Sequence, residues 1–111
     1  MKKILILSII FLNLFSGDFS KIREKNIYEI DKIINIYKNR LNCIKENNPP
    51  KECITKYPNN KKSDNLALLL CSSFPASYYK NILVRDIKML ENEKICWGKA
   101  LNREDVINCL K

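Results

Sequence analysis

The 111-residue chain contains no histidine, only two glycines and no pair of cysteines with CxxC spacing. Histidine is the side chain used most often for acid–base catalysis near neutral pH, so chemistry of that kind is not expected. A zinc site needs four ligands from closely spaced cysteines or histidines, and thioredoxin-like redox and c-type haem motifs both require CxxC. A glycine-rich phosphate loop and a nucleophile elbow are also missing. We therefore expect no enzyme activity, no metal and no cofactor.

The chain also lacks an apolar run of the roughly 20 residues needed to span a bilayer. It opens instead with MKKILILSIIFLNLFSG, in which two lysines precede a short, mainly apolar run and two small residues. This order is typical of a signal peptide, here residues 1–17. An uncleaved membrane tether is the alternative, because Leu14 and Phe15 stand where a cleavage site usually has small side chains. We expect an exported protein, periplasmic or secreted, with residues 18–111 forming a single domain.

Positive charge exceeds negative charge, with 20 lysines and arginines against 12 aspartates and glutamates and a formal net charge of +8. A basic surface favours an acidic protein or an anionic envelope surface as the partner. Nucleic acid is not an expected partner, because export removes the protein from it. Part of the basic character also follows from a composition that is rich in lysine, isoleucine and asparagine.

Two long stretches carry apolar residues three and four positions apart, which is the spacing of one face of an α-helix. They cover residues 21–47 and 77–100. The apolar residues in phase are Ile27, Ile30, Ile34, Tyr37, Leu41 and Ile44 in the first stretch, and Tyr79, Leu83, Ile87, Leu90 and Trp97 in the second. We therefore predict two long helices.

Shorter helices are predicted between and after these two. Pro49-Pro50 ends the first long helix, and a short helix follows around KECITKY. Residues 58–65 are expected to form a loop, with Ser63 or Asp64 capping a buried helix over NLALLLCSSF, and Asn102 is expected to cap a terminal helix. No alternating strand pattern competes. The predicted class is all-α, a small disulfide-stapled helical bundle with two long and two or three short helices.

All five cysteines follow the predicted signal peptide, so they would enter an oxidising compartment in which disulfides persist. Cys43 and Cys53 lie on either side of the NNPP break, and Cys96 and Cys109 lie on either side of the break at residues 101–102. Two helices joined by a short turn can bring such residues to disulfide distance. We predict the disulfides Cys43–Cys53 and Cys96–Cys109, while other pairings of the five cysteines stay open at this point.

Cys71 is left over in the apolar segment LALLLCSSF. We expect a buried free thiol that packs as a small, inert side chain with a raised pKa. The alternatives are a reactive thiol and an intermolecular disulfide that links two copies of the chain.

The second cysteine pair lies in a motif of the form C-x3-A-x4-D-[LV]-x2-C. Its positions are Cys96, Ala100, Asp105, Val106 and Cys109. This segment resembles a motif of uncharacterised small exported bacterial helical proteins, and the resemblance implies a disulfide-bonded helical fold and no activity. Arg40 and Cys43 fit the usual start of the motif, but Asn47 replaces its alanine and the prolines shorten the spacing to Cys53.

These features predict a non-catalytic binding or inhibitory module of the cell envelope that presents a basic surface to an acidic protein or another anionic partner. The candidate contacts are Lys56, Tyr57, Lys61, Lys62, Arg85 and Lys88. The competing and more common interpretation of such lysines is ordinary solvated surface. The alternative functions are a membrane-surface or membrane-tethered envelope protein, and a thiol-active protein that uses Cys71.

Overall fold

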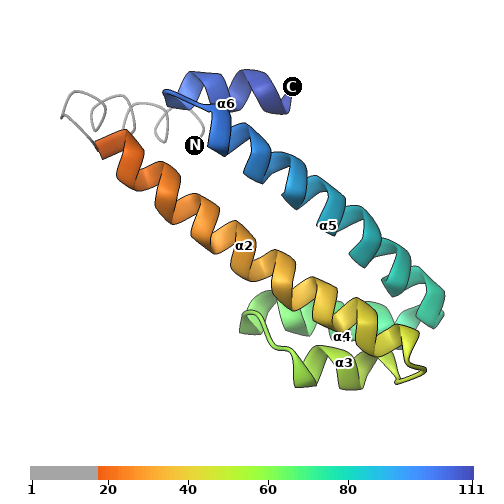
Figure 1. Ribbon diagram of the computed structural model, residues 1–111. Coiled ribbons are helices and arrows are strands. Elements are labelled where there is room, and N and C mark those ends of the chain that lie inside the picture. The colour runs from red at the N-terminus through yellow and green to blue at the C-terminus, as the bar shows by residue number, and fades with distance from the viewer. Residues whose placement is uncertain (1–17) are drawn as a thin grey trace. The chain divides into compact units, whose positions relative to one another are not determined.

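The computed structural model describes residues 18–111, which are all-α (Figure 1). The helices are Asp18–Lys45 (α2), Pro50–Lys56 (α3), Lys61–Ser73 (α4), Ala76–Lys99 (α5) and Arg103–Leu110 (α6). The described range contains no strand, so the predicted fold class is confirmed, with three short helices accompanying two long ones. The predicted signal peptide lies outside the described residues.

The end of α2 falls within the ENNPP sequence, as predicted. Asn47 has a φ of 69°, in the left-handed region that asparagine tolerates better than most residues and that commonly ends a helix. The Cys43 carbonyl near the end of the helix accepts hydrogen bonds from the Asn48 side-chain amide at 3.0 Å and from the Asn48 backbone N–H at 3.3 Å. Pro50 then opens α3, where its missing N–H has no partner to lose.

The start of α4 differs from the sequence prediction. The loop expected over residues 58–65 ends before Lys61, and the helix cap is Asn60 rather than Ser63 or Asp64. The Asn60 side chain accepts a hydrogen bond from the Ser63 backbone N–H at 2.9 Å. The prediction was wrong because it depended on apolar periodicity, which is missing from this polar first turn, whereas the cap stabilises the turn without it.

The burial of α4 was also predicted incorrectly. Ala67 is its only buried residue, while Leu66 and Leu69 are 59% and 63% exposed. Leu68 and Cys71 are partly buried and pack against the core. The helix therefore leaves apolar side chains exposed to solvent.

The described chain divides into two compact units. The first unit comprises residues 18–31 and 91–111, and the second comprises residues 32–90. The single domain expected over residues 18–111 stays a prediction, and each unit is described by itself.

In the first unit, the start of α2 packs against the end of α5. The rings of Phe19 and Trp97 are stacked with centroids 6.1 Å apart, and both residues are buried. Arg23 Nη1 donates a hydrogen bond to the Ala100 carbonyl at 3.1 Å. These contacts hold the end of α5 in place.

The terminal helix α6 begins as predicted. Asn102 caps it, because its side chain accepts a hydrogen bond from the Asp105 backbone N–H at 2.9 Å. The Asp105 carboxylate in turn accepts a hydrogen bond from the Leu101 backbone N–H at 2.9 Å. Val106, one residue further along, is buried in the core of this unit.

In the second unit, four helices contribute to one apolar core. Its buried centre comprises Ile54 of α3, Ala67 of α4, and Tyr79 and Leu83 of α5. Partly buried residues surround this centre: Tyr37, Leu41 and Ile44 of α2, and Leu68 and Cys71 of α4. In Figure 1, α3 and α4 accordingly lie beside the C-terminal part of α2.

Candidate functional site

Each unit contains one disulfide. Cys43 is bonded to Cys53 with a Cα–Cα distance of 5.7 Å, which joins the end of α2 to α3. Cys96 is bonded to Cys109 with a Cα–Cα distance of 5.6 Å, which joins α5 to α6. These are the two predicted pairs. Cys71 is the free cysteine and is half-buried.

The most unusual polar feature of the second unit is the buried side chain of Arg40, which is 2% exposed. Its Nε donates a hydrogen bond to the Tyr57 carbonyl at 2.8 Å, and its Nη1 donates one to the Tyr79 hydroxyl at 3.0 Å. Its Nη2 lies 2.7 Å from Asp64 Oδ1. Because a buried charge is tolerated only when it is paired and hydrogen-bonded, this network fixes α2 to the α3–α4 connection and to α5.

The network favours the charged guanidinium and the neutral phenol. Burial acts to lower the pKa of Arg40, but the hydrogen bonds and charges of Asp64 and Tyr79 outweigh it and raise this pKa above its usual value. Burial also raises the pKa of Tyr79, and the nearby Arg40 offsets only part of that increase. Neither group is suited to proton transfer near neutral pH, and the network connects three parts of the unit.

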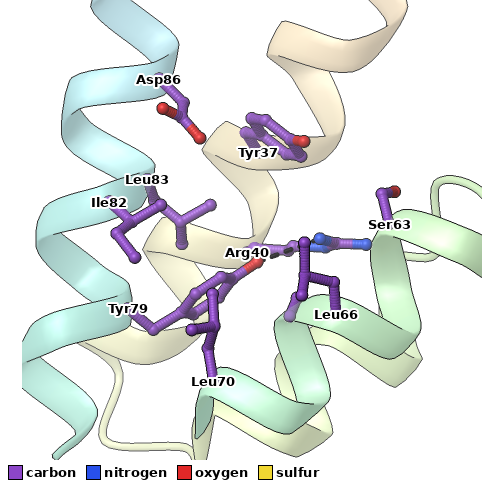
Figure 2. Close-up of a pocket in the computed structure, with 10 residues that line it drawn as sticks. Tyr37, Arg40, Ser63, Leu66, Leu70, Tyr79, Ile82, Leu83 and Asp86 are labelled. Carbon is purple, nitrogen blue, oxygen red and sulfur yellow. Dashed lines mark hydrogen bonds between the residues drawn. The ribbon is translucent and has the colours of Figure 1, made fainter. Parts of the chain in front are cut away.

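Beside this network, α2, α4 and α5 enclose a half-open pocket of about 140 Å³ (Figure 2). Most of its lining is apolar. The lining residues are Tyr37, Arg40, Ser63, Leu66, Ala67, Leu70, Tyr79, Ile82, Leu83 and Asp86. In Figure 2, Tyr37 and Asp86 lie toward one end of the pocket and Leu70 toward the other, with the hydrogen bond from Arg40 to Tyr79 between them. The Asp86 carboxylate accepts hydrogen bonds from Arg85 at 3.2 Å, so it is not an isolated negative charge.

The six candidate contact residues all lie in the second unit, and none of them lines this pocket. Lys56 is exposed at the end of α3, where its Nζ lies 5.7 Å from the centroid of the Tyr57 ring. Tyr57 itself is half-buried. The other four are exposed: Lys61 and Lys62 on the first turn of α4, and Arg85 and Lys88 on α5. These cations therefore come from three helices of the unit, α3, α4 and α5.

Sequence reasoning did not identify the pocket or the Arg40 network. The pocket residues come from three separate segments, 37–40, 63–70 and 79–86, and the network adds Tyr57; only the fold brings these residues together. One signal was available in the sequence. Arg40 stands between Tyr37 and Leu41, beside the apolar stripe of the first long helix, and a cation at such a position needs a buried partner.

The two units differ in charge. Residues 32–90 contain 11 lysines and arginines and 4 aspartates and glutamates, a net charge of +7. Residues 18–31 and 91–111 together contain 7 lysines and arginines and 8 aspartates and glutamates, a net charge of −1. The basic excess of residues 18–111 thus belongs entirely to the unit that contains the pocket.

Across residues 18–111, no group of three or more acidic or cysteine side chains is arranged to hold a metal ion. No helix in that range is both long enough and apolar enough to cross a membrane. The chain matches no protein-family model, no curated protein and no solved structure. The charge distribution, the pocket and the disulfides are therefore the features of the chain that bear on its function.

Proposed function

We propose that this protein is an exported, non-catalytic binding module of the cell envelope whose second unit presents a basic surface to an acidic protein. The separation of charge between the two units carries the proposal. If the basic character were only a consequence of composition, the excess would be spread over the chain, whereas residues 32–90 carry +7 and the described remainder carries −1. A basic surface of this kind accelerates encounter with an acidic partner and disfavours basic ones.

The exposure of the cations supports the same function. Lys56, Lys61, Lys62 and Lys88 are all exposed, whereas the buried cation, Arg40, is neutralised by Asp64. Exposed lysines contribute little to folding, so they are free to contribute to association. Removing them should therefore weaken binding without unfolding the protein.

The two disulfides support export, because such bonds persist in oxidising compartments and are rare in the cytosol. The environment of Cys71 argues against the thiol-active alternative. Burial raises the pKa of Cys71, and the nearby charges of Lys51 and Arg40 offset only part of that rise. A thiol with a raised pKa forms less of the nucleophilic thiolate at neutral pH.

The test is capture of envelope proteins on the immobilised, oxidised chain at low ionic strength, followed by elution with increasing salt. The proposal predicts that an acidic protein is retained and then eluted by moderate salt without detergent, because the contacts between surface charges are screened. Sedimentation with phosphatidylglycerol vesicles, but not with phosphatidylcholine vesicles, in the absence of any retained protein would favour the membrane-surface alternative instead.

A further inference from the structure

The pocket is part of a longer apolar surface, here called the α4–α5 face, that comprises Leu66, Leu70 and Phe74 together with Tyr78 and Ile82. Leu66, Leu70 and Ile82 line the pocket. Phe74 and Tyr78 extend the surface past Leu70, with their rings stacked at a centroid distance of 4.5 Å. Residues four apart share one side of a helix, so Leu66 and Leu70 form one row on α4 and Tyr78 and Ile82 form one row on α5, while Phe74 follows the end of α4.

This face is more exposed than apolar side chains normally are when they serve only to fill a core. Leu66 is 59% exposed, and Phe74 and Tyr78 are 46% and 43% exposed. Contiguous exposed apolar surface of this kind commonly marks an interaction site. The pocket gives the face a defined centre, since a cavity of about 150 Å³ is large enough to hold benzene and this one measures about 140 Å³. It therefore has room for one aromatic or large aliphatic side chain.

The charges near the face select the kind of partner. Lys62 lies one turn before Leu66 on the same side of α4 and is exposed. Arg85 lies three residues after Ile82 on α5; its side chain is 68% exposed and is paired with Asp86, a carboxylate of the pocket lining. A second copy of the chain would bring a second +7 unit against these cations, so charge repulsion opposes self-association through this face. An acidic partner has the opposite, favourable interaction.

We infer that the α4–α5 face docks an acidic segment of a partner protein. One aromatic or large aliphatic side chain of that segment fills the pocket, and its flanking carboxylates lie near Lys62 and Arg85. This inference rests on the proposed function and specifies its contact surface. The apolar anchor supplies most of the affinity, as buried aromatic side chains do at other interfaces. The cations orient the acidic segment and raise its association rate.

The test uses the full oxidised chain and three short peptide probes with blocked ends. The first probe is Glu-Glu-Phe-Glu-Glu, the second replaces the phenylalanine with alanine, and the third replaces the glutamates with glutamines. Affinity is measured at low ionic strength from amide chemical-shift changes during titration. We expect the first probe to bind about tenfold more tightly than the second, the change that corresponds to burying one large apolar side chain.

Two matched variants locate the contact. Leu66→Glu places a carboxylate at the pocket, whereas Leu69→Glu makes the same change on the same helix at a residue that does not line it. The two leucines are 59% and 63% exposed, so both variants should fold, and both lower the net charge equally. We expect Leu66→Glu to abolish the preference for the phenylalanine probe and Leu69→Glu to retain it.

The outcomes separate the inference from the function on which it rests. Equal binding of the phenylalanine and alanine probes, or equal loss in the two leucine variants, would overturn the inference while leaving a basic binding surface intact. Failure of both acidic probes to bind more tightly than the glutamine probe would contradict the proposed function itself. Binding to phosphatidylglycerol vesicles that Leu66→Glu abolishes and Leu69→Glu retains would assign the face to a membrane and would overturn the inference.

Discussion

Arg40 and Asp64 form a buried ion pair in which Nη2 lies 2.7 Å from Oδ1, and their side chains are 2% and 15% exposed. The second oxygen of the same carboxylate accepts a hydrogen bond from the Asn59 backbone N–H at 3.0 Å. The pair therefore joins α2 to the turn that opens α4. Because Arg40 also lines the pocket, the position of the pocket wall depends on this pair.

Asp64→Ala should lower the free energy of unfolding by about 3 kcal/mol, because it leaves the Arg40 guanidinium buried without its counter-charge. The exposed pair of Arg85 and Asp86 is the matched control. Arg85→Ala should change stability by less than about 1 kcal/mol, since exposed ion pairs contribute little. Urea unfolding followed by circular dichroism measures both variants. Equal losses in the two variants would mean that Arg40 is not held by Asp64 in the way the structure indicates.

Tyr79→Phe should lower the unfolding free energy by about 1–3 kcal/mol at neutral pH, because Arg40 Nη1 loses its buried acceptor. The variant should also change how stability depends on pH. Burial raises the pKa of Tyr79 in the folded state, so ionisation above about pH 10 favours the unfolded chain, and stability falls as the pH rises through the folded-state pKa.

Unfolding in urea at a series of alkaline pH values checks this dependence, with Cys71→Ala as the common background to remove the thiol's own titration and disulfide exchange. The loss of stability in this pH range should be smaller in the Tyr79→Phe variant than in the parent. An identical pH dependence in both proteins would exclude Tyr79 as its source.

Cys71 should react slowly with iodoacetamide in the folded protein at pH 8. Burial raises its thiol pKa and limits access, so less thiolate is available than in the unfolded chain. Intact mass spectrometry should count one alkylation without reductant and five after reduction in denaturant, since four of the five cysteines are in disulfides. Folded-state alkylation as fast as that of the oxidised chain in denaturant would support the thiol-active alternative.

Replacing Cys43 and Cys53 together with serine should lower the free energy of unfolding by about 2–3 kcal/mol, the value expected for closing a loop of this length in the unfolded chain. The Cys96 and Cys109 pair encloses a slightly longer loop and should give a similar loss. Thermal unfolding of both double variants, with Cys71→Ala as a control that breaks no disulfide, measures the effect. Melting temperatures that match the parent would contradict a stabilising role for either bond.

The helices and the two disulfides were predictable from sequence because the sequence patterns that indicate them are local. The apolar stripe of residues 27–44, the proline pair and the Asn102 cap each act within a few positions along the chain. The start of α4 was missed because a polar cap at Asn60, rather than apolar spacing, determines it. The pocket could not be predicted, because Tyr37, Leu66 and Ile82 meet only through the packing of three helices.

The central claim is that residues 32–90 carry the binding surface. The most direct test removes three positive charges from one unit or from the other and compares the two variants. One triple variant replaces Lys56, Lys61 and Lys62 with glutamine, and the other replaces Lys21, Lys25 and Lys99, which are exposed in the first unit. The measurement is the affinity of each for the Glu-Glu-Phe-Glu-Glu probe at low ionic strength. The first variant should lose about tenfold or more in affinity while the second stays within about twofold of the parent, because the proposed contact surface belongs to residues 32–90 and only the first variant removes cations from it. Equal losses in the two variants would show that overall net charge alone governs binding and would contradict the account.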